Sequence, residues 1–71
     1  MKIDVLVAEI GSTTTVVNAF DHINSPHPVF CGQGQAPTSV LAGDVRVGLE
    51  GAVRDLADKL GTPELSWEAM L

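Results

Sequence analysis

The sequence is poor in cysteine. Its 71 residues include a single cysteine, Cys31, so no disulfide framework can form within the chain. Small secreted domains commonly depend on such frameworks, and one free thiol in a short chain is more typical of a reducing cytoplasm. We therefore expect a cytoplasmic protein whose stability comes from its apolar core.

Positive charge is also scarce. Four basic residues stand against nine acidic ones, which gives a net charge of −5 and an isoelectric point of about 4.5. The basic residues are far apart in the sequence: Lys2, Arg46, Arg54 and Lys59. Because no basic stripe is available to follow a phosphate backbone, we expect no nucleic acid among the partners.

Long apolar runs are missing as well. The chain starts with Met1-Lys2-Ile3-Asp4, and the apolar run after Asp4 is short, which is not the pattern of a signal peptide or a membrane span. We expect no membrane partner. Apolar residues still make up 45% of the chain, and the mean hydropathy is +0.24, so a core can form. The length indicates one small domain or a piece of a larger one.

The first part of the chain predicts a β-hairpin. Residues 2–10, "KIDVLVAEI", are rich in Val, Ile and Leu and predict a largely buried strand. Gly11 provides the backbone freedom for a turn. Residues 14–20 are β-branched and aromatic and predict a second strand. The tip of this hairpin is Gly11-Ser12-Thr13.

A third strand and a helix follow. Residues 29–35 predict a strand in which Gly32 and Gly34 indicate a bulge or the close approach of another backbone. From residue 44 to residue 60 the period of apolar residues changes from two to about 3.6, which predicts a helix. Its expected apolar stripe consists of Val45, Leu49, Ala52, Val53, Leu56 and Leu60.

The ends of this helix carry capping signals. Asp44 is a suitable N-cap, and Gly61 followed by Pro63 is a strong stop signal. Gly48 and Gly51 inside the helix indicate close packing on the sheet. In the tail, Ser66 is a candidate N-cap for a second, short helix with Trp67, Met70 and Leu71 on one side.

The stretch "EIGSTTT", from Glu9 to Thr15, raises the question of an anion site. A lysine phosphate loop requires a lysine and a following helix, and neither is predicted here. The glycines near residue 33 do not complete a dinucleotide fingerprint. A tight turn with free N–H groups and hydroxyls is a third way to bind phosphate, and Glu9 is placed to hold Mg²⁺ through water. An ordinary polar hairpin tip remains the alternative.

Three other residues invite a metal interpretation. His22, His27 and Cys31 have a spacing that matches no standard zinc pattern, and the sequence offers no evident fourth ligand. Loop histidines and a buried strand cysteine are the favoured interpretation. Cys31 has no adjacent cation that would lower its pKa, so we expect it in the core.

Two motifs carry a family resemblance. Residues 4–20, "DVLVAEIGSTTTVVNAF", resemble the first phosphate loop of the superfamily that includes actin, heat-shock chaperones and sugar kinases. Residues 32–56, "GQGQAPTSVLAGDVRVGLEGAVRDL", are similar to the glutamate mutase accessory protein family, MutL/GlmL, which is unrelated to the DNA-repair MutL. The resemblance covers nearly the whole chain, and the pairing of the motifs is more specific than the loop alone.

The resemblance implies an α/β fold. The expected architecture is the N-terminal part of an actin-like (ribonuclease H-like) ATPase domain: an antiparallel β-hairpin, a third strand and one packed helix, in the order β-β-β-α. Residues 1–71 would form an incomplete N-terminal subdomain, because a second phosphate loop and an adenosine-binding segment have no counterpart in them. The complete protein would be an ATPase, and the 71 residues alone are expected to be inactive.

The resemblance also implies partners and site residues. Family members are thought to act as ATP-dependent chaperones or reactivating factors for adenosylcobalamin-dependent mutases, so mutase subunits are the expected partners. Gly11, Ser12, Thr13 and Thr14 would contact phosphates of ATP or ADP, bound with Mg²⁺ in the complete protein and not tightly by the 71 residues alone. Glu9 stands where the superfamily usually has a metal-organising Asp, one methylene shorter.

Two alternative functions remain open at this point. The chain could form a small non-catalytic interaction module that dimerises through apolar surface and exposed strand edges. It could also belong to another branch of the same superfamily, such as a small-molecule kinase or an activator of a radical dehydratase. Such activators typically need cysteines for an iron–sulfur cluster, and the single Cys31 gives that branch little support.

Overall fold

The computed structural model describes residues 1–39 and 43–71. Residues 40–42, which belong to the segment "TSVLA" for which no element was predicted, lie outside the described residues. The described residues form four strands and one helix: β1 (Lys2–Ile10), β2 (Thr14–Asp21), β3 (Val29–Pro37), α1 (Val45–Leu60) and β4 (Ser66–Met70).

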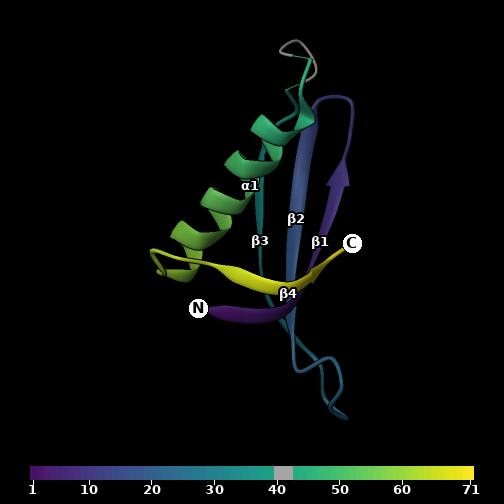
Figure 1. The fold of residues 1–71 in the computed structure, drawn as a ribbon, viewed down its shortest axis with the longest axis vertical. Coiled ribbons are helices and arrows are strands. Elements are labelled where there is room, and N and C mark those ends of the chain that lie inside the picture. The colour runs from purple at the N-terminus through teal and green to yellow at the C-terminus, as the bar shows by residue number, and fades with distance from the viewer. Residues whose placement is uncertain (40–42) are drawn as a thin grey trace.

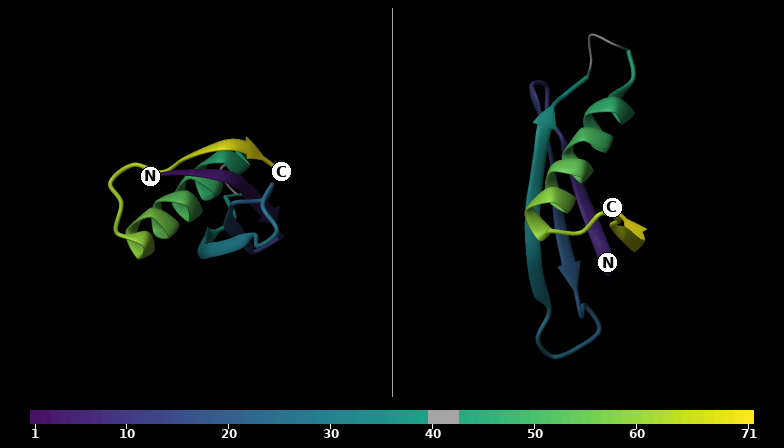
Figure 2. Two further views of the ribbon diagram at one scale, coloured as in Figure 1. Left: turned by 90° about the horizontal axis from the view of Figure 1, so that it is seen from below. Right: turned by 90° about the vertical axis from the view of Figure 1, so that its left-hand side faces the viewer.

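The strands form one mixed sheet in the order β3-β2-β1-β4. The pairs β1–β2 and β2–β3 are antiparallel, whereas β4 runs parallel to β1. The helix α1 lies against one face of the sheet, alongside β3 and β2 (Figures 1 and 2). This α/β arrangement confirms the expected β-β-β-α architecture and is consistent with the start of an actin-like domain.

The core lies between α1 and the sheet. On β2, the alternate residues Thr15, Val17 and Ala19 are fully buried, whereas the residues between them are less buried. Their period of two places them on one face of the strand. The core cluster consists of Ile3, Leu6, Val17, Ala19, Ala52 and Leu56.

Small residues let α1 approach the sheet closely. A Cβ atom added to Gly34 of β3 would lie against the carbonyl oxygen of Ala52 and 2.6 Å from the backbone nitrogen of Leu56. On the helix, a Cβ added to Gly48 would lie 2.7 Å from the carbonyl oxygen of Pro37. The expected close backbone approach is therefore confirmed on both elements.

The expected bulge in β3 is also present. Ala19 pairs with Gly32, but the next residue of β2, Phe20, pairs with Phe30, so Cys31 is the extra residue. Cys31 is partly buried and packs against the core cluster. Burial first, and the charge of Asp21 second, raise the pKa of its thiol, so the thiol form is favoured over the nucleophilic thiolate.

Both ends of α1 follow the capping signals. Asp44 has an extended backbone and accepts a hydrogen bond from the N–H of Arg46, and Gly61 ends the helix in the left-handed conformation with φ of 69°. The predicted apolar stripe is buried in its middle, at Ala52 and Leu56, with Leu49, Val53 and Leu60 partly buried around it. Val45, in contrast, is 39% exposed at the first turn.

The prediction of a second short helix starting at Ser66 is wrong. Residues 66–70 form β4, whose Ser66 N–H donates to the carbonyl oxygen of Met1 (2.9 Å), while Leu71 N–H donates to that of Leu6 (2.9 Å). A helix of one or two turns is marginal on its own. The free edge of β1 provides hydrogen-bond partners for these backbone groups. Because β1 is far away in the sequence, the local pattern around residue 66 gives no sign of them.

Within the described residues, no helix is long and apolar enough to cross a membrane.

Candidate functional site

The candidate site is the loop between β1 and β2. Gly11 N–H donates to the carbonyl oxygen of Thr14 (3.0 Å), which closes a tight turn with Ser12 and Thr13 exposed at its tip. Because β2 starts directly at Thr14, no helix follows the loop, as the sequence predicted. The loop stands at the same end of the molecule as the first turn of α1 (Figure 1).

Gly11 has a different role from the expected one. Among the described residues, positive φ angles occur only at His22, Gly43 and Gly61, so Gly11 does not supply a left-handed conformation to the turn. A Cβ added to Gly11 would instead lie 3.0 Å from the carbonyl oxygen of Thr14. Glycine therefore provides space for the closing hydrogen bond, and contacts from outside the loop also help to orient its peptide groups.

Thr38, directly after β3, provides such contacts. Its hydroxyl donates to the carbonyl oxygen of Gly11 (2.8 Å), and its backbone N–H donates to that of Thr13 (3.0 Å). The hydroxyl of the buried Thr15 lies 2.9 Å from the hydroxyl of Thr38. Sequence reasoning missed Thr38 because it is 27 residues from Gly11, and only the register of β2 and β3 brings the two together.

These contacts leave the amides at the tip free. Two loop carbonyls face Thr38, whereas the N–H groups of Ser12 and Thr13 have no acceptor among residues 1–39 and 43–71. Their side-chain hydroxyls are also exposed. The tip therefore presents hydrogen-bond donors with two nearby carbonyl acceptors already engaged, which is the local chemistry of an anion site.

A hollow of 340 Å³ adjoins the loop. It is lined by Thr13, Thr14, Gln35, Ala36 and Pro37. Two of the four predicted phosphate-contact residues thus line the hollow, and Gly11 and Ser12 do not. Gln35 of β3 is not among the predicted phosphate-contact residues. Its place in the hollow follows from the pairing of β2 with β3.

Glu9 is exposed on β1, two residues before the loop. It pairs with Val16, which in turn pairs with Gln35 on β3, so these three residues form a row across one face of the sheet. The row lies on the face away from α1, because the neighbouring residue Thr15 faces the core. The described residues hold no group of three or more His, Cys, Asp or Glu side chains placed to bind a metal ion.

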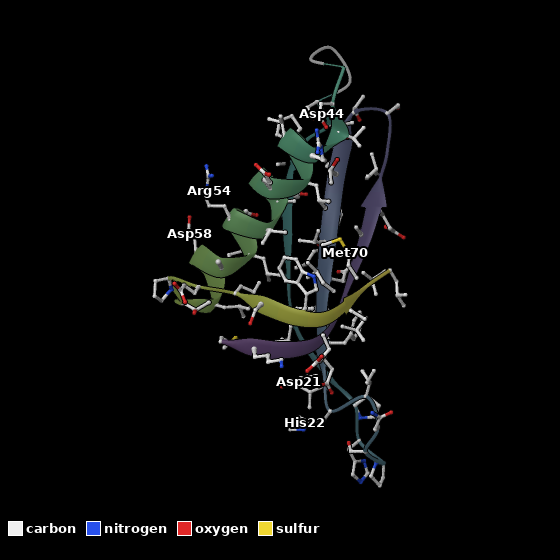
Figure 3. The ribbon with its side chains drawn as sticks, in the orientation of Figure 1. Asp21, His22, Asp44, Arg54, Asp58 and Met70 are labelled. Atoms are coloured by element: carbon white, nitrogen blue, oxygen red, sulfur yellow. The ribbon has the colours of Figure 1, made fainter. Side chains whose placement is uncertain are left out.

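The N-cap of α1 carries a carboxylate, that of Asp44. The side chain of Arg46 holds the pKa of Asp44 below its usual range, and the Arg46 N–H adds to this effect. Asp44 lies at the loop end of the molecule (Figure 3). The Asp44 carboxylate therefore caps one N–H of the helix and pairs with the Arg46 side chain.

A second, apolar hollow of 190 Å³ lies on the same side of the sheet as α1. Leu49, Glu50 and Val53 line it from α1, and Trp67 and Met70 line it from β4. Figure 3 places Met70 beside the helix, whereas Arg54 and Asp58 project from the outer side of α1. This hollow is separate from the loop and holds one ionisable side chain, Glu50.

Fold and loop together define an α/β protein that opens with a β-hairpin closed by a tight, hydroxyl-rich turn. A scan against protein-family models matches residues 5–71 to the model described as MutL protein. The match covers nearly the whole chain, so the chain belongs to the MutL family, the glutamate mutase accessory proteins that its motifs resemble. Comparison with curated proteins and with solved structures gives no match.

Proposed function

We propose that the chain contributes the first phosphate-binding hairpin to an ATP-dependent chaperone or reactivating factor of an adenosylcobalamin-dependent mutase. Residues 1–71 are, in this proposal, the incomplete N-terminal subdomain of an actin-like ATPase domain in the cytoplasm. The partners are mutase subunits of the glutamate mutase or aminomutase type. Membership of the MutL family supports the accessory role and favours it over a small-molecule kinase.

The observation that carries the proposal is the set of open donors at the hairpin tip. The N–H groups and hydroxyls of Ser12 and Thr13 are available, and Thr13 and Thr14 line the adjoining hollow. Phosphate oxygens accept several hydrogen bonds at once, and bonds to charged acceptors are about twice as strong as neutral ones. Gly11 makes room for the tight turn, and Glu9 holds the Mg²⁺ of the bound nucleotide through water.

The uncovered face of the sheet supports an incomplete domain. This face carries the partly buried Val7, Val16 and Phe20, with Phe30 beside Phe20 at a ring-centroid distance of 5.5 Å. Phe30 is 56% exposed. Among the described residues α1 is the one helix, and it lies on the opposite face, so this face is open to a further part of the domain.

Mg-ATP titration tests this function. The ¹⁵N-labelled chain is titrated with millimolar Mg-ATP, and the amide shifts of residues 12–14 are followed. We expect saturable shifts in the wild type and at least tenfold weaker binding in Ser12→Ala/Thr14→Val, because a hydrogen bond to a charged group contributes about 1.5–3 kcal/mol and tenfold in affinity is about 1.4 kcal/mol.

A matched control removes two hydroxyls from the other end of the molecule. Ser25 and Thr62 each donate from their side chains to a backbone carbonyl oxygen, of His22 and Glu64 respectively. Ser25→Ala/Thr62→Val should bind Mg-ATP like the wild type. Equal affinity in the hairpin variant and the wild type would remove the loop from the site.

A second candidate function is self-association as an interaction module. The specific observation in its favour is apolar exposure at two places, Phe30 on the uncovered face and Leu71, which is 75% exposed, next to β4. Exposed apolar surface and an open strand edge both favour pairing with another chain. Sedimentation, described in the Discussion, separates this candidate from the first.

A further inference from the structure

Thr38 contacts the hairpin loop through two different groups. Its hydroxyl donates to the carbonyl oxygen of Gly11 (2.8 Å), and its backbone N–H donates to the carbonyl oxygen of Thr13 (3.0 Å). The loop is otherwise closed by the single bond from Gly11 N–H to Thr14. Thr38 therefore defines the orientation of two of the peptide groups in the turn.

The orientation of a carbonyl determines that of the next amide. In a trans peptide the C=O and the N–H of one planar unit point in opposite directions, and the described residues contain no cis peptide bond. Because the Gly11 carbonyl points to Thr38, the Ser12 N–H points away from it. The Thr13 carbonyl is held by Thr38 in the same way, whereas Thr14 faces Gly11 through its own carbonyl oxygen. The Ser12 donor is thus held by a residue that it does not contact.

Thr38 is itself anchored in the core. Its hydroxyl proton is used in the bond to Gly11, so the Thr15 hydroxyl is the donor in the 2.9 Å contact between the two threonines. Thr15 is fully buried, and its β-branched side chain has few rotamers. A chain of hydroxyls therefore runs from the core, through Thr38, to the Gly11 carbonyl.

We infer that Thr38, anchored by Thr15, is a positioning residue that aims the Ser12 amide of the hairpin at a phosphate group. This inference rests on the proposed phosphate-binding function and adds a residue beyond the loop to it. Thr38 touches no phosphate in this arrangement. It acts by holding the Gly11 and Thr13 carbonyls on its own side of the loop and the Ser12 amide on the other, which lowers the ordering needed on binding.

Three variants separate positioning from stability. Thr38→Val removes the hydroxyl but also leaves the buried Thr15 hydroxyl without its acceptor. Thr15→Val/Thr38→Val replaces both hydroxyls by methyl groups, so no buried donor is orphaned, while the bond to Gly11 is still lost. Thr38→Ser keeps the hydroxyl. Thr62→Val is the matched control, because it removes a similar hydroxyl-to-carbonyl bond (2.7 Å, to Glu64) far from the loop.

The experiment uses two readouts on the ¹⁵N-labelled chain. Relaxation order parameters of residues 12–14 report the rigidity of the free loop, and titration with inorganic phosphate, against chloride of equal ionic strength, reports binding. We expect Thr15→Val/Thr38→Val to lower the loop order parameters and to weaken phosphate binding about tenfold. Thr38→Ser and Thr62→Val should match the wild type in both readouts.

The possible failures are distinguishable. A wild-type loop whose amides do not respond to phosphate overturns the phosphate-binding function, and the role of Thr38 with it. A wild-type response that persists unchanged in Thr15→Val/Thr38→Val overturns the role of Thr38 alone. If Thr38→Val fails to fold, the double variant still decides the question, because its buried groups remain satisfied.

Discussion

At the scale of single residues, the packing of α1 on the sheet depends on a position without a side chain, Gly34. Gly34 allows the backbone of α1 to pass directly over β3, with Ala52 and Leu56 as the nearest helix residues. Both helix residues are fully buried. The helix and the sheet are therefore very close together at this point. Their packing requires that residue 34 has no side-chain carbon.

Gly34→Ala should therefore destabilise the fold. The new methyl group would meet backbone atoms of α1, which cannot rotate away, and overpacking of this kind typically costs about 1–3 kcal/mol. Urea unfolding followed by Trp67 fluorescence measures this loss. Gly51→Ala is the matched control: its methyl group would lie 3.1 Å from the Ala36 side chain, and alanine favours the helix by up to about 1 kcal/mol. Equal stability of the two variants would contradict the close approach.

At the scale of elements, α1 protects one edge of the sheet. Asp55 accepts a hydrogen bond from the N–H of Gln35 on the outer edge of β3 (2.9 Å), and Lys59 donates to the carbonyl oxygen of Gln33 (3.4 Å). Asp55 and Lys59 also form an ion pair at 2.9 Å. Unpaired backbone N–H and C=O groups on an edge strand can pair with the strand of another chain. Asp55 and Lys59 occupy two such groups of β3 and so hinder this pairing.

This edge contact should depend on pH. The Gln35 N–H first, and Lys59 second, lower the pKa of Asp55. The carboxylate therefore stabilises the folded state above its unfolded pKa of about 3.9, and this stabilisation is lost as the pH falls through the lower folded-state pKa. We expect Asp55→Asn to lower the melting temperature at pH 7 and the difference from the wild type to shrink as the pH falls toward 2, as measured by circular dichroism.

The control for this experiment is Asp58→Asn, on the same helix. Asp58 projects from the outer side of α1 (Figure 3), so its substitution should leave the slope of the melting temperature against pH as in the wild type. A difference between Asp55→Asn and wild type that stays constant from pH 7 to pH 2 would show that the charge of Asp55 does not act through this contact.

At the scale of the whole molecule, the two faces of the sheet differ. One face is covered by α1, and the other carries exposed or partly exposed apolar side chains, among them Phe30. The helix covers β3 and β2 more than β1 (Figure 2). The molecule therefore carries exposed apolar side chains on the face opposite α1.

Sedimentation equilibrium tests self-association through this face. If the uncovered face binds a second copy, Phe30→Ser should weaken association at least tenfold, because burial of a large apolar side chain contributes about 1.5–3 kcal/mol. Val47→Ser is the control, since Val47 is similarly exposed (59%) but lies on α1. A wild-type chain that stays monomeric at high concentration would contradict the self-association candidate and leave the nucleotide-binding proposal untouched.

The family assignment and much of the fold were predictable from local patterns. The strand–turn–strand unit, the helix with its caps at Asp44 and Gly61, and the bulge near Gly32 all match the structure. Each depends on residues close together in the chain, whose propensities and periodicities act over a few positions. For Gly11 the structure adds a requirement for space, because a Cβ there would lie 3.0 Å from the Thr14 carbonyl oxygen.

By itself, the sequence determined the hairpin "EIGSTTT", the helix boundaries and the apolar stripe that packs on the sheet. Only the tertiary structure decided that residues 66–70 are a strand and that Thr38 holds the loop. It also decided that Asp55 covers the edge of β3. The physical reason is common to all three. Their hydrogen bonds join backbone groups to partners about 20 to 65 residues away, and only the assembled sheet brings such partners within bonding distance.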